Sequence, residues 1–118
     1  MAKQIKSGLY HKDIYLPKIS FRSVDIVLNY TYHAIDAAEN DRYGVIDLPE
    51  TINFSLCEVV EMEFVDGKLF KVVVRTHHDQ KHDLVLVVLI NGFRVKTVWL
   101  NRKNDKHQTL DHTKYNTK

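Results

Sequence analysis

Two apolar stretches joined by Asn91-Gly92 constrain the fold of this chain more than any other feature. Residues 84–90 are apolar at every position, and residues 93–100 follow with the two-residue period of a β-strand. Asn-Gly is favoured in the two-residue turns that join antiparallel strands, because both turn positions need positive φ. The pattern predicts a β-hairpin whose first strand is covered on both faces of its sheet.

Two more strands are predicted before this hairpin. The period changes to two from residue 57 onward, and Asp66-Gly67 then supplies a second tight turn. Residues 69–76, which follow, are rich in β-branched side chains that favour a strand. The four strands together predict an antiparallel β-meander.

One helix is predicted ahead of the meander, over residues 21–40. Its apolar positions recur at three- and four-residue steps, and the polar run that ends at Gly44 would stop it. A helix with one apolar face packs economically on one face of a sheet. The expected fold class is therefore α+β, with one main α-helix packed on a four-stranded antiparallel β-meander.

A chain of 118 residues is expected to form one domain. Residues 1–20 show no sustained period, and Pro17 excludes a regular helix there, so we expect an N-terminal arm. Residues 21–111 are expected to form the α+β domain, and residues 112–118 a polar tail.

Composition narrows the classes of function. The formal net charge of +2 gives no strong global attraction to nucleic acid, so any such attraction must come from local clusters. The longest apolar run, residues 84–90, is too short to span a membrane, and the N-terminus carries no apolar signal region. Cys57 is the only cysteine, which excludes an intrachain disulfide; it is expected in the core. We expect a cytoplasmic protein without a membrane partner or cofactor.

The polar segment after the last strand carries most of the groups suited to chemistry. His107 can take and give a proton near neutral pH, and Lys106 beside it can stabilise a developing phosphorane charge. Thr109 is a candidate positioning group, while Arg102 and Lys103 form a basic cluster that could hold RNA phosphates. These are the needs of metal-independent RNA cleavage. The alternative is a solvated polar loop that carries a helix cap.

Arg75 is a second candidate, as a stabiliser of the phosphate or the transition state. It lies at the end of a strand that runs in the same direction as the last strand, so the two ends share one sheet edge. The alternative is a surface arginine paired with Asp79 or a neighbouring glutamate. His33 and Arg42 could add a positioning group and an RNA contact to the same cleft.

The loop with His77, His78 and His82 has the composition of a crude metal site. It lacks cysteine and a second well-placed ligand pair, so no metal is expected there.

Several segments together carry a resemblance to a known group of proteins. They are His33-Ala34, Asp41-Arg42-Tyr43-Gly44, Lys71-Val72-Val73-Val74-Arg75, Val98-Trp99-Leu100-Asn101 and residues 105–111. This order resembles the small RelE/ParE-type toxin domains and, more broadly, the barnase–EndoU–colicin–RelE grouping of metal-independent ribonucleases. The C-terminal end also resembles uncharacterised phage and bacterial proteins. The resemblance covers about residues 24–111.

The resemblance implies a small domain that cleaves or binds RNA and is often held by a protein inhibitor. Arg75 matches a strand arginine of this grouping, and His107 matches a late acid/base residue. The expected function is a metal-independent endoribonuclease-like domain, with RNA and an inhibitor or host protein as partners. ParE-type members act by binding a protein, so the alternative is a non-enzymatic protein-binding module, for example a phage-encoded inhibitor of a host protein.

Overall fold

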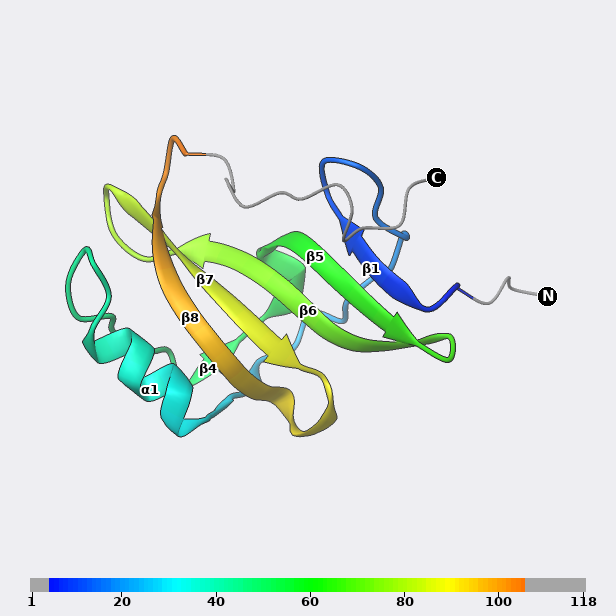
Figure 1. The fold of residues 1–118 in the computed structure, drawn as a ribbon, viewed down its shortest axis with the longest axis horizontal. Helices are drawn as coiled ribbons and strands as arrows, with labels where there is room; N and C mark the ends of the chain where they lie inside the picture. Colours follow the sequence, from blue (N-terminus) through cyan, green and yellow to red (C-terminus); the bar gives the residue numbers. More distant parts are fainter. Residues whose placement is uncertain (1–4, 106–118) are drawn as a thin grey trace.

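Strands dominate the fold in the computed structural model, which describes residues 5–105 (Figure 1). The strands of the large sheet are β1 Gly8–His11, β3 Asn29–Tyr30, β5 Glu58–Val65, β6 Lys68–His77, β7 His82–Leu89 and β8 Arg94–Arg102. They lie side by side in the order β1-β5-β6-β7-β8-β3. A second sheet pairs β2 Ile26–Val27 with β4 Thr51–Ile52.

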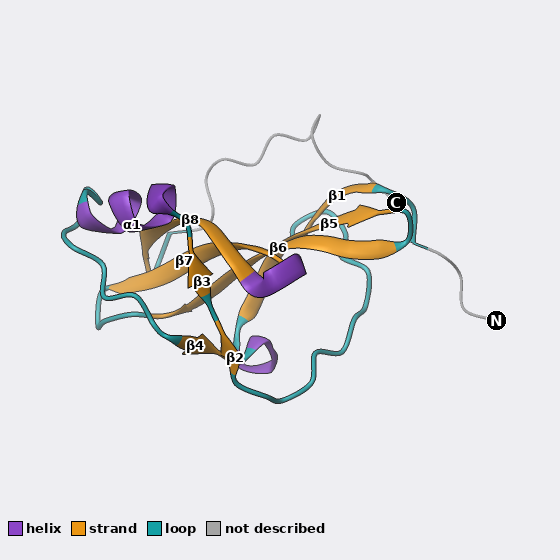
Figure 2. Ribbon diagram, turned by 90° about the horizontal axis from the view of Figure 1, so that it is seen from below, coloured by secondary structure: helices purple, strands orange, loops and turns teal. Residues whose placement is uncertain are grey.

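One α-helix, α1 Tyr32–Glu39, packs against β8. Two short 3₁₀ turns, η1 Phe54–Leu56 and η2 Asn91–Phe93, complete the described elements. In Figure 2 the small β2–β4 sheet lies below the large sheet, on one side of it. No described helix has the length and apolar character needed to cross a membrane.

The expected fold class, one main helix on a four-stranded antiparallel meander, is wrong. The consecutive strands β5 to β8 do pair antiparallel, but β1 adds to the outer edge of β5. At the opposite edge β3 pairs in parallel with β8, so the sheet has six strands and is mixed. Such pairings join residues far apart in the sequence, and a local period cannot reveal them.

The helix begins at residue 32, directly after Thr31, which caps its N-terminus. The backbone of Thr31 is extended, and its side chain accepts a hydrogen bond from the amide of Ala34, as an N-cap does. Residues 26–27 and 29–30 are extended instead of helical, since they pair with β4 and β8. Predicting a helix over residues 21–40 therefore merged two edge strands with one short helix.

The expected N-terminal arm contributes to the sheet. β1 pairs with β5 from Gly8↔Phe64 to His11↔Glu61. The ring of Tyr10 meets Phe64 edge to face, with 5.8 Å between centroids, and His11 is fully buried. Residues 8–11 thus cover the edge that β5 would otherwise expose.

The large sheet is apolar on both faces. A main cluster packs one face against α1 and the small sheet, and a second cluster on the other face consists of Val60, Val73, Val85 and Val87 beside Trp99. Residues 84–88 of β7 are buried without exception, which confirms the prediction of a strand covered on both faces.

The two predicted turns have different outcomes. Asp66 and Gly67 both adopt positive φ, of 51° and 79°, as a type I′ turn requires. At Asn91-Gly92 the β7–β8 ladder closes at Leu89↔Arg94, which leaves a longer loop than the two-residue turn expected. This loop also contacts β3, since the Asn29 side chain donates a hydrogen bond to the Gly92 carbonyl at 2.8 Å.

Candidate functional site

Arg75 anchors the end of β8 to the centre of the sheet. Its side chain is only 8% exposed, and its Nε donates to the carboxylate of Asp83 on β7 at 2.8 Å. Its terminal nitrogens donate to the carbonyls of Arg102, Lys103 and Asp105 at 2.8, 3.4 and 2.9 Å. The predicted meeting of Arg75 with the segment after β8 is therefore present, and the guanidinium fixes the path of residues 102–105.

Asp83 is shared between two cations. Besides Arg75, it accepts a hydrogen bond from Lys103 Nζ at 2.7 Å, and that ammonium also lies 2.9 Å from His77 Nδ1. Partial burial raises the pKa of Asp83, but the hydrogen bonds and charges of Lys103 and Arg75 outweigh burial and hold that pKa below its ordinary value. Asp83 is therefore an ionised link between β6, β7 and the end of β8.

This lowered pKa predicts a specific pH dependence of stability. A carboxyl group whose pKa is lower in the folded state stabilises the fold above its ordinary pKa, about 3.9, and loses this contribution as the pH falls towards the folded value. We expect the free energy of unfolding, measured with urea, to fall less steeply between about pH 5 and pH 3 in Asp83→Asn than in the wild type. Parallel slopes in the two proteins would contradict the ion-pair assignment.

Three nitrogen-bearing side chains contact the ring of Tyr43 near the end of β8. The guanidinium carbons of Arg42 and Arg102 lie 4.8 and 5.6 Å from the centre of its ring, within the range of cation–π attraction. The ring of His82 lies 4.7 Å away, tilted by 36°. We call Arg42, Tyr43, His82 and Arg102 the Tyr43 cluster.

Asp41 explains why Tyr43 lies at this place. After α1 ends, the carboxylate of Asp41 accepts hydrogen bonds from the backbone amides of Tyr43, at 3.0 Å, and Leu100, at 3.2 Å. The first bond shapes the turn after the helix, and the second ties that turn to β8. Arg102, two residues beyond Leu100 on β8, places its guanidinium group over the Tyr43 ring of that turn.

The Tyr43 cluster borders a cavity of about 470 Å³, which we call the cationic cavity. Its lining residues are Tyr43, Gln80, Lys81, His82, Arg102, Lys103 and Asn104. Three of them are cationic, and none of those in the described part of the chain is acidic. A cavity with this local charge can attract anions even though the whole chain carries only +2.

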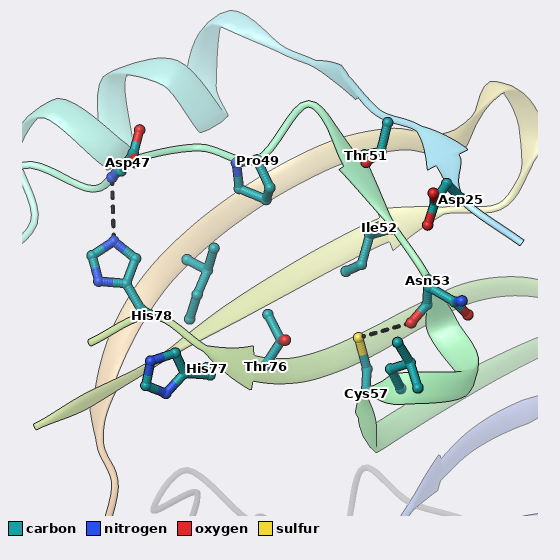
Figure 3. A pocket seen from close by; sticks show the side chains of 12 residues that line it. Asp25, Asp47, Pro49, Thr51, Ile52, Asn53, Cys57, Thr76, His77 and His78 are labelled. Atoms are coloured by element: carbon teal, nitrogen blue, oxygen red, sulfur yellow. Dashed lines mark hydrogen bonds between the residues drawn. The ribbon is translucent and has the colours of Figure 1, made fainter. Parts of the chain in front are cut away.

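A second cavity, of about 480 Å³, lies between the small sheet and the end of β6 (Figure 3). Its lining residues include Asp25, Asp47, His77 and His78. The amide of Asp47 donates to His78 Nε2 at 3.3 Å, drawn as a dashed line in Figure 3. With two carboxylates and no Lys or Arg among its lining residues in the described chain, this cavity suits a phosphate ligand less well.

Cys57 also lines the second cavity. Its thiol donates to the Asn53 carbonyl at 3.4 Å, and burial raises its pKa despite a hydrogen bond with Thr76 that lowers it. A raised pKa keeps the thiol protonated at neutral pH, which makes it a poor nucleophile.

Asp79 holds the loop between β6 and β7 in shape through hydrogen bonds. It accepts hydrogen bonds from the amides of Lys81 and His82, both at 2.8 Å, and its carboxylate contacts the Nδ1 atoms of His78 and His82 at 3.1 and 3.0 Å. The hydrogen bond with His78 is the largest cause that holds the pKa of Asp79 well below its ordinary range. Among residues 5–105, no group of three or more His, Cys, Asp or Glu side chains is arranged to hold a metal ion.

The structure separates some of the predicted site residues and brings others together. Arg42, Arg102 and Lys103 meet around Tyr43 and the cationic cavity, and Arg75 fixes the backbone beneath them. His33 is exposed near the start of α1, where the Thr31 side chain binds the Lys96 carbonyl. Six strand residues, or about 20 Å, separate Lys96 from Arg102. Lys106, His107 and Thr109 lie outside the described residues.

Sequence reasoning missed Tyr43, Lys81 and His82 as members of this site. In the sequence, Tyr43 stands in the polar run after the predicted helix and in one segment of the family resemblance, and His82 stands in a weak metal pattern. The available signal was the Arg42-Tyr43 pair, since an arginine beside an aromatic residue is a common combination in RNA recognition.

No protein-family model, curated protein or solved structure matches this chain. The resemblance to RelE/ParE-type domains therefore stays a prediction, and the functional argument depends on the geometry of the site.

Proposed function

We propose that this chain is an RNA-binding, metal-independent endoribonuclease-like domain that holds single-stranded RNA at the cationic cavity. One observation carries the proposal: the guanidinium groups of Arg42 and Arg102 both lie over the ring of Tyr43. Tyr43 and Arg102 line the cationic cavity together with Lys81 and Lys103. Proteins that bind single-stranded nucleic acid combine such a positive groove with aromatic rings on which bases stack.

The two kinds of group have different roles in this proposal. Arg102 and Arg42 neutralise backbone phosphates, which gives affinity without reading sequence, while the Lys103 ammonium is already paired with Asp83. Because Arg42, Arg102 and His82 lie against the Tyr43 ring, an unpaired base would take the place of one guanidinium group on the π-face of that ring and leave the guanidinium group free to bind a phosphate. Double-stranded RNA keeps its bases stacked and out of reach. Cleavage would be an attack of the ribose 2′-hydroxyl on the adjacent phosphate, which needs a proton acceptor and nearby cations but no metal ion. The sequence-based prediction remains that His107 is the acid/base group, with Lys106 as a charge stabiliser and Thr109 as a positioning group.

The first test measures RNA affinity by fluorescence anisotropy, with a short labelled RNA of mixed sequence. We expect Arg102→Ala and Arg42→Ala each to weaken binding, and each lost phosphate contact to reduce the slope of log affinity against log salt by about 1. Arg94→Ala is the matched control, because Arg94 is an exposed arginine near the opposite end of β8. An equal loss in Arg94→Ala would contradict a site at the cationic cavity.

Cleavage is tested on the same RNA in the presence of EDTA. The proposal expects products with a 2′,3′-cyclic phosphate and a 5′-hydroxyl, and no cleavage of an RNA whose riboses lack the 2′-hydroxyl. Binding without cleavage would retain the RNA-binding part of the proposal and reject the enzymatic part.

A non-enzymatic protein-binding module is the second candidate, and exposed apolar side chains favour it. Tyr32, Leu56, Val45 and Val27 are 92, 79, 73 and 67% exposed. Exposed apolar side chains can take part in contacts with another protein where they lie together in one patch. A wild-type chain without RNA affinity, whose capture of a host protein is abolished by Leu56→Asp, would replace the RNA proposal with this one.

A further inference from the structure

We propose that His82 is the proton acceptor of the cationic cavity and that Asp79 positions its ring, an inference that rests on the proposed RNA-cleaving function. No other described residue of the cavity lining is a histidine or a carboxylate. His82 is therefore the candidate proton acceptor among residues 5–105 that line this cavity.

The hydrogen bonds of Asp79 define which nitrogen of His82 carries the proton. An ionised carboxylate can only accept hydrogen bonds, and Asp79 Oδ1 and Oδ2 lie 3.0 and 3.3 Å from His82 Nδ1. His82 Nδ1 must therefore be protonated, which leaves the lone pair of a neutral imidazole on Nε2. Within residues 5–105, that Nε2 atom makes no hydrogen bond.

Two further contacts hold the His82 ring in place. The His82 amide donates to Asp79 Oδ1 at 2.8 Å, so backbone and side chain are bound by the same carboxylate. On its flat side, the ring packs on Tyr43 with 4.7 Å between centroids. A histidine oriented by a carboxylate, with its second nitrogen available, is the arrangement that general base catalysis requires.

The cations around His82 fit the charge that develops during cleavage. Arg102, Lys81 and Lys103 line the same cavity as His82, so a phosphate bound in this cavity would meet both the cations and the imidazole. Preorganised cations of this kind stabilise the negative charge that a phosphorane gathers on its oxygens.

The chemical step is a transesterification that needs no co-reactant. His82 Nε2 takes the proton of the 2′-hydroxyl, and the 2′-oxygen forms a new bond to phosphorus. The bond from phosphorus to the 5′-oxygen breaks, and that oxygen leaves with a proton from water. The imidazolium then gives its proton to the hydroxide that remains, so the net products are a 2′,3′-cyclic phosphate and a 5′-hydroxyl.

The experiment compares the full-length wild-type chain with His82→Ala, on the labelled RNA in EDTA. Because general acid–base catalysis contributes about 10²- to 10⁴-fold, we expect a loss of that order in kcat with RNA affinity little changed. Free imidazole, added in the millimolar range or above, should restore part of the activity of His82→Ala. Arg102→Ala is the control for this rescue, since its defect is the loss of a cation at the phosphate, which imidazole should not correct.

Asp79→Asn tests the positioning role. The asparagine keeps an oxygen that can accept from the amides of Lys81 and His82, so the loop is retained while the carboxylate charge is removed. We expect a lower kcat at an unchanged KM. A change in KM alone would assign Asp79 to the loop structure and overturn its role in catalysis.

The outcomes separate the inference from the proposed function. Cleavage by wild type that is lost in His82→Ala and rescued by imidazole supports both. Equal cleavage by wild type and His82→Ala overturns the role of His82 and leaves the proposed function standing. Loss without imidazole rescue makes His82 structural and also overturns the inference. A wild type that does not cleave overturns the proposed cleavage and, with it, the role of His82.

Discussion

Replacing Arg75 with alanine is expected to lower the free energy of unfolding by about 3–5 kcal/mol, the usual cost of removing one partner of a buried ion pair. The change leaves the Asp83 carboxylate, which is 19% exposed, without one of its two cations. It also removes the donors for the carbonyls of Arg102 and Asp105. Urea unfolding followed by circular dichroism measures the difference.

Arg94→Ala serves as the matched control for this change. Arg94 is an exposed strand arginine, and such surface substitutions usually change stability by about 0.5 kcal/mol or less. Arg75→Lys is expected to lie between the two, because one ammonium cannot reproduce the fork of donors that reaches both Asp83 and residues 102–105. Similar losses for Arg75→Ala and Arg94→Ala would mean that the end of β8 does not depend on Arg75.

Replacing Tyr43 with alanine is expected to produce the largest loss of RNA affinity of any single change at the site. Stacking of a base on an aromatic ring contributes about 1–3 kcal/mol, which corresponds to roughly a five- to 150-fold loss of affinity. The ring also holds the guanidinium groups of Arg42 and Arg102, so its removal loosens two phosphate contacts as well. Fluorescence anisotropy with the labelled RNA measures the affinity.

Tyr43→Phe distinguishes stacking from hydrogen bonding by the hydroxyl group. It keeps the ring and its contact with His82, so we expect an affinity close to that of the wild type. If phenylalanine weakened binding as much as alanine, the hydroxyl would be the recognition element and the stacking account would be incorrect. Both variants need a stability measurement, since Tyr43 is partly buried.

The parts of the fold that depend on local chemistry were predictable from the sequence. Asp66-Gly67 demands a tight turn whatever surrounds it, and the unbroken apolar run in β7 indicates burial on both faces. The prediction that the helix begins at residue 21 is wrong. The apolar spacing of residues 24–28 fits a helix, but pairing with β4 and β8 holds residues 26–27 and 29–30 extended. Tertiary pairing outweighed local preference there.

The candidate site was predictable only in part, for the same reason. Arg102 and Lys103 are adjacent in the sequence, and strand direction placed Arg75 beside them. Tyr43 comes from the turn after α1 and His82 from the first position of β7, and they meet only in the folded chain, through the bond of Asp41 to β8 and the hydrogen bonds of Asp79. No spacing rule connects residues 43 and 82, so their stacking could not be expected from the sequence.

Photo-crosslinking tests the central claim, that RNA binds on the Tyr43 ring, most directly. A single-stranded RNA that carries 4-thiouridine is irradiated with the wild-type chain, and the attached peptides are identified by mass spectrometry. The account predicts crosslinks at Tyr43 and along the lining of the cationic cavity, with the Tyr43 crosslink lost in Tyr43→Ala. Crosslinks confined to other surfaces, such as the exposed apolar side chains of Tyr32 and Leu56, would contradict it.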